Sequence, residues 1–201
     1  MQTYRIGITG GIGSGKTTVC RILEILGLPV YYSDLRARQL IESDPRVRLL
    51  YKRLFGDDVY ASGQLNRPLV AAQLFNNPML KTEVEKVVHP IVRSDFEQWF
   101  LQQKSRMVIN EAAIMFESGS YRSMDAVILV TAPEQVRIQR VMKRDGLTKE
   151  QVLARIKMQW SEEKKRTLSQ YIVECDDVQM VIPQVLDVHQ KILSHLKHDG
   201  S

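Results

Sequence analysis

The segment at residues 10–17, Gly-Gly-Ile-Gly-Ser-Gly-Lys-Thr, restricts the possible folds of this chain most, because it fits the pattern G-x-x-x-x-G-K-[ST] without a mismatch. Residues 4–9 before it form an apolar run typical of a short strand, and residues 17–26 after it carry apolar side chains at helical spacing. A strand, a glycine loop and a helix in this order predict a phosphate-binding loop. The alternative is a glycine-rich turn with an incidental lysine at a helix start.

Each residue type in this loop has a physical reason to be there. Glycine lets the backbone curl around phosphate oxygens with several N–H groups pointing inward, and the following helix adds the positive end of its dipole. Lys16 is expected to reach the β and γ phosphates of ATP, and the Thr17 hydroxyl is expected to bind Mg²⁺. The expected ATP-binding residues are Gly11, Ile12, Gly13, Ser14, Gly15, Lys16, Thr17 and Thr18.

The rest of the chain predicts a parallel sheet. Short runs at residues 29–33, 107–110 and 126–130 are typical of strands, and residues 171–173 form a weaker fifth candidate. Helical patterns separate these runs, as parallel strands require, because each return needs a crossover. We therefore expect an α/β fold, a three-layer α/β/α kinase fold with a five-stranded parallel sheet.

A long helical stretch, about residues 44–104, separates the second predicted strand from the third. His89-Pro90 is expected to interrupt a helix there before residues 91–101. Since no linker, repeat or low-complexity tract divides the chain, we expect one domain over residues 1–201 with this stretch as a helical insertion.

Composition excludes several classes of protein. With 201 residues, 44% of them hydrophobic, the chain can bury one sizeable core. The N-terminus lacks a signal-peptide pattern, no apolar run approaches membrane-spanning length, and Cys20 and Cys175 show no CxxC or Cys/His pairing. We therefore expect no disulfide framework, no zinc site and no membrane partner, and a cytoplasmic location.

The net charge of +5 favours polyanionic partners, which could be nucleotides or nucleic acids. The basic residues do not alternate with aromatic residues as on an RNA-binding sheet, and many of them fall within residues 137–165. A lid over bound phosphates would explain that cluster, so we expect no nucleic-acid partner.

A phosphate loop alone does not identify a reaction, but other features favour a kinase over a GTPase or a motor ATPase. No Asn-Lys-x-Asp guanine signature occurs, and the chain is too short for a large coupling domain. Asp34 follows the second predicted strand, where the carboxyl ends of parallel strands line the ligand crevice. We expect Asp34 to orient or deprotonate the acceptor hydroxyl, unless Ser33 or Asp34 only caps the next helix.

Residues 133–145 predict a helix with Arg137, Arg140 and Arg144 on one face. Small kinases need arginines that close over the phosphates, exclude water and neutralise charge during transfer. We therefore predict a lid at about residues 137–165. The alternative is a solvated helix face.

Three further polar residues have both a functional and a structural interpretation. Arg67 begins a predicted helix, where a cation is unfavourable for the dipole, so an anion is expected beside it. His89 either binds an acceptor phosphate or is a buried histidine bonded to backbone. Glu117 either contacts Mg²⁺ or the acceptor, or is a surface acid beside a turn.

Over nearly its whole length the chain resembles the dephospho-CoA kinase family. Residues 7–18 are close to the wording of that family's phosphate loop, and Asp34-Leu35-Arg36-Ala37-Arg38 is similar to its acid followed by a helix. The other landmarks are Leu65-Asn66-Arg67, Leu74-Phe75, Val88-His89-Pro90-Ile91, Phe116-Glu117-Ser118-Gly119, residues 140–145, Gln159 and Lys164. Apart from the loop the pieces are individually weak, but their order and spacing are specific.

The resemblance implies ATP-dependent phosphorylation of the 3'-hydroxyl of dephospho-CoA, the last step of coenzyme A biosynthesis, with Mg²⁺ as cofactor. It implies ATP at residues 12–17 and an acceptor hydroxyl near Asp34. The expected partners are the small molecules ATP and dephospho-CoA, bound by a monomer or weak homo-oligomer. The expected catalytic residues are Asp34, Lys16, Arg140 and Arg144, and the expected substrate-binding residues are Thr9, Asp34, Arg67, His89 and Glu117.

The sequence departs from the family's pattern at several positions. Tyr32 stands where many members have a second acid, and Ser169-Gln170 and Cys175 replace an Ala-Asp and an asparagine near the fifth strand. Adenine contacts in that loop are therefore not transferred. Two other functions stay open: a small-molecule kinase of the nucleoside monophosphate or shikimate kinase type, and a nucleotide-dependent nucleic-acid binder suggested by the positive charge.

Overall fold

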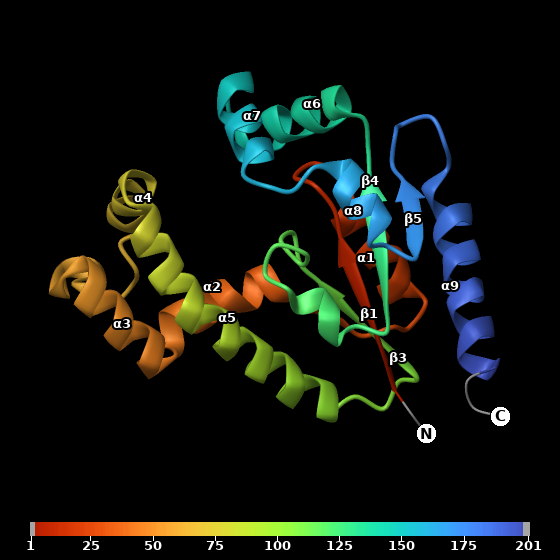
Figure 1. The fold of residues 1–201 in the computed structure, drawn as a ribbon, viewed down its shortest axis with the longest axis horizontal. Helices are drawn as coiled ribbons and strands as arrows, with labels where there is room; N and C mark the ends of the chain where they lie inside the picture. The colour runs from red at the N-terminus through yellow and green to blue at the C-terminus, as the bar shows by residue number, and fades with distance from the viewer. Residues whose placement is uncertain (1–2, 199–201) are drawn as a thin grey trace. The chain divides into compact units, whose positions relative to one another are not determined.

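The computed structural model describes residues 3–198, and the chain divides into two compact units (Figure 1). The first unit combines the chain up to Tyr31 with the chain from Gln103 onward, and the second is the intervening Tyr32–Gln102. Organisation as one domain with an insertion and a lid stays a prediction.

A five-stranded sheet with the strand order β2-β3-β1-β4-β5 forms the centre of the first unit. β1 pairs in parallel with β3 and β4, and β4 pairs in parallel with β5. The predicted parallel sheet is therefore confirmed, including its weaker fifth strand. The strands are β1 (Tyr4–Thr9), β2 (Val30–Tyr32), β3 (Met107–Glu111), β4 (Ala126–Thr131) and β5 (Tyr171–Glu174).

The central strands are apolar on both faces. Ile6 and Ile8 of β1 are fully buried, and they lie opposite Ile109 of β3 and Ile128 of β4 respectively. Strands buried on both faces need continuous apolar runs instead of alternation, which made these segments recognisable in the sequence. Because the strands are parallel, the residues that follow β1, β3 and β4 gather at one edge of the sheet.

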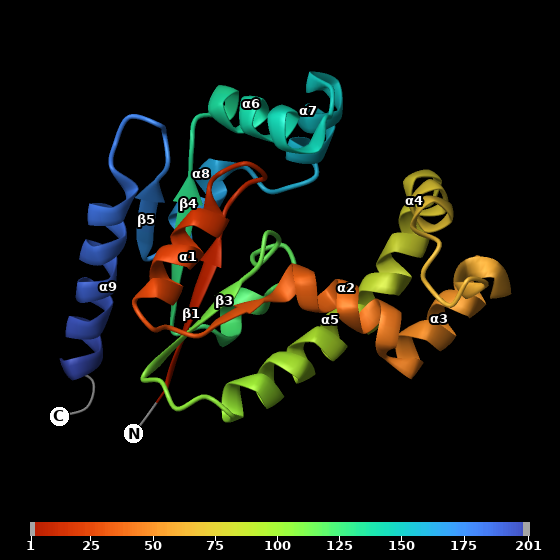
Figure 2. The same ribbon diagram turned by 180° about the vertical axis from the view of Figure 1, so that it is seen from behind.

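Helices cover both faces of the sheet (Figure 2), which confirms the three predicted layers. On one face α1 (Lys16–Ile25) contacts β1, β3 and α9 (Val181–His198), and on the other α8 (Glu162–Thr167) packs on β4. The short turn η2 (Ser120–Ser123) precedes β4, and α6 (Glu134–Asp145) follows it and packs against α7 (Lys149–Lys157). Within residues 3–198, no helix combines the length and apolar character needed to span a membrane.

The second unit is helical, as the sequence predicted. Asp44 and Asn66 accept backbone N–H groups and so cap the helices that follow them, with Pro45 and Pro68 in the first turns, where a missing N–H breaks no helical bond. The elements are α2 (Ser33–Ser43), α3 (Pro45–Phe55), η1 (Asp57–Tyr60), α4 (Arg67–Asn76) and α5 (Pro78–Leu101). Their shared core contains Val47, Tyr51, Phe55, Val59, Tyr60, Val70, Val84, Val88 and Ile91.

α5 is one helix of 24 residues with Pro90 in its interior. The prediction that His89-Pro90 interrupts a helix is therefore wrong. An interior proline removes one backbone hydrogen bond and crowds the preceding turn, at a cost of about 3 kcal/mol. Val84, Val88 and Ile91 on both sides of it are buried in the core of the unit, and burial of such side chains contributes about 1.5–3 kcal/mol each. Packing thus outweighs the local defect.

Substituting Pro90→Ala should stabilise the chain by about 1–2 kcal/mol, because alanine restores a backbone N–H for the Lys86 carbonyl one turn earlier. Pro90 is exposed, so no core packing is lost. Urea unfolding measures the change. Pro68→Ala is the matched control, since this exposed proline lies in the first turn of α4 and gains no helical bond. Equal effects of the two substitutions would contradict the explanation.

Candidate active site

The phosphate loop joins β1 to α1 and turns through glycines. Gly13 and Gly15 have φ angles of 79° and 102°, in the left-handed region that glycine adopts without strain. Lys16 Nζ donates to the Gly10 carbonyl at 2.8 Å and to the Gly11 carbonyl at 3.3 Å, so the lysine spans the loop. The predicted succession of strand, loop and helix is confirmed.

Neighbouring atoms crowd the loop glycines. A Cβ atom added at Gly10 would lie 2.1 Å from the Val130 carbonyl oxygen, and one at Gly13 would lie 2.6 Å from the Arg137 carbonyl oxygen. A Cβ atom at Gly11 would lie 2.7 Å from the Arg137 guanidinium carbon. At Gly10 and Gly13 the obstacle is backbone, so a larger residue fits only if the backbone moves.

Two of the three arginines predicted on one face of α6 contact this loop. Arg137 donates through Nε to the Ile12 carbonyl at 3.1 Å, and Arg140 donates through Nη1 to the Gly13 carbonyl at 3.3 Å. Only 7% of the Arg137 surface is exposed. The alternative of a solvated helix face is therefore wrong for these two residues.

Arg144, the third arginine, pairs with its neighbour. Its guanidinium donates to the two carboxylate oxygens of Asp145 at 2.7 and 3.0 Å, and this pairing raises the pKa of Arg144 and lowers that of Asp145. Arg140, in contrast, also donates to the Cys175 carbonyl at 2.8 Å and pairs with Asp177, so it joins α6 to the segment after β5. Catalytic roles for Arg140 and Arg144 stay predictions.

A polar cluster of Glu117, Gln159, Trp160 and Lys165, here called the Glu117 cluster, lies beside the loop. Gln159 Oε1 accepts the Ile12 N–H at 2.9 Å, and Glu117 Oε1 accepts the Trp160 N–H at 2.8 Å. Lys165 Nζ lies 2.9 Å from Glu117 Oε1. The Glu117 side chain is only 15% exposed, so the interpretation of Glu117 as a surface acid is wrong.

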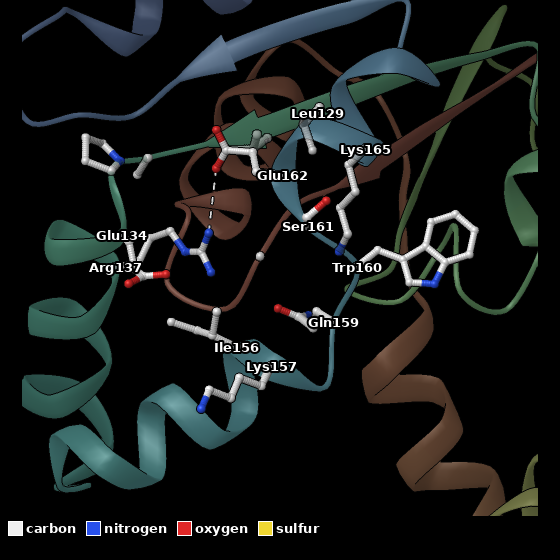
Figure 3. A pocket seen from close by; sticks show the side chains of 14 residues that line it. Leu129, Glu134, Arg137, Ile156, Lys157, Gln159, Trp160, Ser161, Glu162 and Lys165 are labelled. Atoms are coloured by element: carbon white, nitrogen blue, oxygen red, sulfur yellow. Dashed lines mark ion pairs between the residues drawn. The ribbon is translucent and has the colours of Figure 1, made fainter.

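Three members of the Glu117 cluster, Gln159, Trp160 and Lys165, line a cavity of about 420 Å³ in the first unit. Its wall combines Gly11 of the loop, the end of β4, the first turns of α6, the α7–α8 connection and the start of α8. Figure 3 shows Gln159 and Lys165 beside it and marks an ion pair between Arg137 and Glu162, 3.6 Å apart. Sequence reasoning missed Lys165, since nothing in a run of charged residues shows which one is buried.

Other buried polar groups lie at the carboxyl edge of the sheet. The hydroxyls of Thr9, at the end of β1, and Ser14, in the loop, are buried and have no hydrogen-bond partner among the described residues. Glu111 ends β3 and is also buried. Burial, and then the charge of Glu111, raises the pKa of the Cys20 thiol on α1. An acid directly after an apolar strand was the signal that could have identified Glu111 as a candidate.

In the second unit, Asp34 lies in the first turn of α2, directly after β2. The alternative interpretation required Ser33 or Asp34 to be the N-cap residue of α2. Tyr32 occupies that position instead. The proximity of Asp34 to the phosphate loop stays a prediction.

Arg67 begins α4 and has the anion that its position required. Its Nη2 donates to Glu42 Oε1 at 3.0 Å, and the other oxygen of Glu42 accepts the Leu65 N–H at 3.0 Å. The anion is thus one of the protein's own carboxylates. Binding of the acceptor by Arg67 stays a prediction.

His89 is half-buried in α5. Burial lowers the pKa of its imidazole, and Glu85 acts in the opposite direction. The folded chain therefore favours a neutral imidazole, and a role in acceptor binding stays a prediction. Within residues 3–198, no group of three or more His, Cys, Asp or Glu side chains could hold a metal ion.

A parallel sheet with a glycine-rich phosphate loop after β1, and with arginines of the helix after β4 on that loop, defines a P-loop kinase. The dephospho-CoA kinase family model matches residues 4–180. The chain therefore belongs to the dephospho-CoA kinase family. Membership confirms the predicted function, ATP-dependent phosphorylation of dephospho-CoA in coenzyme A biosynthesis, and favours neither alternative.

Relatives match along nearly the full chain. A dephospho-CoA kinase of Porphyromonas gingivalis is 40% identical over 191 residues, 93% of each chain. One of Bacteroides fragilis is 37% identical over 196 residues, 95% of this chain and 96% of that one. The crystal structure of TT1252 from Thermus thermophilus, at 34% identity, covers 98% of this chain and 99% of its own with a TM-score of 0.85. A shikimate kinase of Acinetobacter baumannii, at 18% identity, shares the fold with a TM-score of 0.55 over 96% of this chain and 94% of its own.

Gly13→Ala should destabilise the chain and weaken ATP binding, whereas Gly27→Ala should only destabilise it. Both glycines have positive φ, so both substitutions carry a strain of about 1–2 kcal/mol, but only Gly13 meets backbone, and Gly27 has open space around it. Urea unfolding and calorimetric titration with ATP measure the two effects. Equal ATP affinity in the two variants would contradict the crowding argument.

His89 should make stability fall more steeply in mild acid. Its folded pKa lies below the unfolded value of about 6.5, so the unfolded chain binds more protons as the pH falls through that value, and stability is lost there. Urea unfolding at a series of pH values from about 7.5 to about 5.5 should show a larger loss for the wild type than for His89→Gln. Parallel curves for the two proteins would rule out this contribution.

Proposed function

We propose that the chain transfers the terminal phosphoryl group of Mg-ATP to the 3'-hydroxyl of dephospho-CoA, the last step of coenzyme A biosynthesis. The acceptor oxygen bonds to the γ-phosphorus, the bond from that phosphorus to the β–γ bridging oxygen breaks, the hydroxyl proton leaves, and ADP and coenzyme A form. The observation that most supports this proposal is the glycine loop, which is crowded by neighbouring backbone and spanned by Lys16. The chain that carries this loop is a member of the dephospho-CoA kinase family.

In this proposal the loop holds the donor. Residues 11–18 and the N-terminus of α1 bind the phosphates of ATP, and Lys16 contacts the β and γ phosphates. Lys16 already lies across the loop at the Gly10 and Gly11 carbonyls, which supports this role.

Mg²⁺ is the proposed cofactor, and the loop offers a donor of the right chemistry. Mg²⁺ prefers oxygen ligands and in phosphoryl-transfer sites is held by few protein groups together with phosphates. Thr17, exposed in the first turn of α1, supplies such a hydroxyl oxygen. When bound, the ion would neutralise charge on the β and γ phosphates.

The acceptor side of the proposal rests on five residues. Asp34 orients or deprotonates the 3'-hydroxyl; because the transition state is loose, its position matters more than its base strength. Thr9, Arg67, His89 and Glu117 are proposed to bind the acceptor. The unpartnered buried hydroxyl of Thr9 supports its inclusion.

A lid formed by residues 137–165 is proposed to close over the phosphates. Arg140 and Arg144 would neutralise charge that develops during transfer and help to exclude water. The bond from Arg140 to the Gly13 carbonyl supports a position of this helix next to the phosphates.

We further propose a monomer or weak homo-oligomer in the reducing cytoplasm, without nucleic-acid or membrane partners. Cys20 and Cys175 are both free and buried, and burial raises the pKa of each thiol, so neither is poised to react.

The function is tested by ADP release from Mg-ATP across a panel of acceptors that includes dephospho-CoA, shikimate and nucleoside monophosphates. Dephospho-CoA should stimulate release, with a 3'-phosphorylated product by mass spectrometry. Lys16→Ala should lower turnover by at least about 10²-fold, because it removes a preorganised cation from the phosphates.

Lys191→Ala is the control for loss of one positive charge, since Lys191 lies on α9 and pairs with Asp187 one turn away. It should keep wild-type turnover. Absence of stimulation by dephospho-CoA would overturn the proposed acceptor, and binding to DNA that falls steeply with salt would favour a nucleic-acid binder instead.

A further inference from the structure

Lys165 of α8 is an unusual lysine, because its side chain is only 2% exposed. Most lysines keep the ammonium in water, since an ion loses hydration when it is buried. Lys165 instead lines the cavity beside the phosphate loop, and Figure 3 shows its side chain running past that space with the nitrogen next to Trp160. A cation in such a place requires compensating oxygens.

Glu117 supplies only part of this compensation. Lys165 Nζ lies 2.9 Å from Glu117 Oε1, but the contact lacks the angles of a hydrogen bond, and that oxygen already accepts the Trp160 N–H at 2.8 Å. Lys165 Nζ and Glu117 Oε2 are both buried without a hydrogen bond among the described residues. An ammonium has three donors, so another oxygen in the cavity would satisfy what Glu117 does not.

The phosphate loop faces the same cavity. Gly11 forms part of its wall, and Gln159, at its border, accepts the Ile12 N–H at 2.9 Å. Arg137 also lines the cavity and donates to the Ile12 carbonyl at 3.1 Å. A polyanion held by the loop would therefore present its oxygens next to the space that Lys165 lines.

The cavity is surrounded by charges of both signs. Three cations, Arg137, Lys157 and Lys165, line it together with two acids, Glu134 and Glu162. Glu162 is already engaged, because it pairs with Arg137 at 3.6 Å. With Glu117, which pairs with Lys165, the three cations are matched by three acids, so the case for an anion rests on the unsatisfied donors of Lys165 and not on net charge.

A purely structural ion pair is the competing interpretation. Buried ion pairs are often no more stabilising than apolar side chains of the same volume, so stability does not explain why a lysine stands here. In a purely structural pair, the buried polar atoms would be expected to have hydrogen bonds. Here Lys165 Nζ and Glu117 Oε2 both lack one.

We propose that Lys165 is a further catalytic residue whose ammonium binds an oxygen of the terminal phosphoryl group, in bound ATP and during transfer. The inference rests on the proposed function. A preorganised cation of this kind lowers the barrier as charge develops on the transferred group. Glu117 is then a positioning residue that holds the ammonium in place.

Lys165→Met tests the proposal, because methionine matches the unbranched side chain as far as Cε and lacks the charged ammonium. We expect kcat for dephospho-CoA phosphorylation to fall by about 10²-fold, as for other preorganised donors. ATP affinity, measured by calorimetry, should fall by about tenfold while ADP affinity is unchanged, since ADP lacks the terminal phosphoryl group. Lys191→Met removes the same charge from α9 and should change neither quantity.

Lys165→Met also leaves the Glu117 charge uncompensated, so the variant could fail to fold. The double variant Glu117→Gln/Lys165→Met removes both charges, and glutamine can still accept the Trp160 N–H. Low kcat and a lowered ratio of ATP to ADP affinity, in a double variant that unfolds at the wild-type temperature, would support the proposal. Wild-type kcat in the folded double variant would reduce the pair to a structural role.

Two further outcomes separate this inference from the proposed function. A rise only in the KM for dephospho-CoA would place Lys165 on the acceptor and overturn the proposal. If the wild type does not phosphorylate dephospho-CoA, the proposed acceptor is wrong, but the ratio of ATP to ADP affinity still decides the role of Lys165. If the ratio of ATP to ADP affinity is the same in the wild type, in Lys165→Met and in the double variant, the proposed role of Lys165 is wrong.

Discussion

The backbone of the phosphate loop lies against the end of β4 and the first turns of α6 with no room for a Cβ atom between them. The Val130 carbonyl stands over Gly10, and the Arg137 backbone stands over Gly13. Because these contacts are backbone to backbone, they fix the path of the loop more firmly than side-chain packing could. The loop is thus shaped by the sheet and by α6, and a backbone held in this way reduces the ordering cost of nucleotide binding.

Lysine and arginine side chains donate hydrogen bonds to the backbone carbonyls of this loop. Lys16 bonds to the carbonyls of the first two loop glycines, Arg137 bonds to that of Ile12, and Arg140 bonds to that of Gly13. In a planar trans peptide the C=O and the next N–H point in opposite directions, so holding these carbonyls also fixes the amides. The same side chains place positive charge around the loop.

The sequence sufficed for features that depend on local pattern, such as the strands, the loop and the helical spacing of the α6 arginines. It could not show which of those arginines reach the loop, because burial of Ile138 and Val141 against α7 sets the rotation of α6. Continuity of α5 through Pro90 likewise depends on packing against other helices. Arg67 pairs with Glu42, and Lys165 pairs with Glu117. The two members of each pair are far apart in the sequence, so no local pattern predicts the pairing.

A shared fold leaves the acceptor undecided, since the shikimate kinase of Acinetobacter baumannii has the same architecture at 18% identity. The sheet and the phosphate loop serve the donor, which such kinases have in common. The second unit, Tyr32–Gln102, has its own hydrophobic core and its own capped helices. The folding of this unit therefore depends on its own core and caps, which are separate in sequence from the residues that shape the phosphate loop.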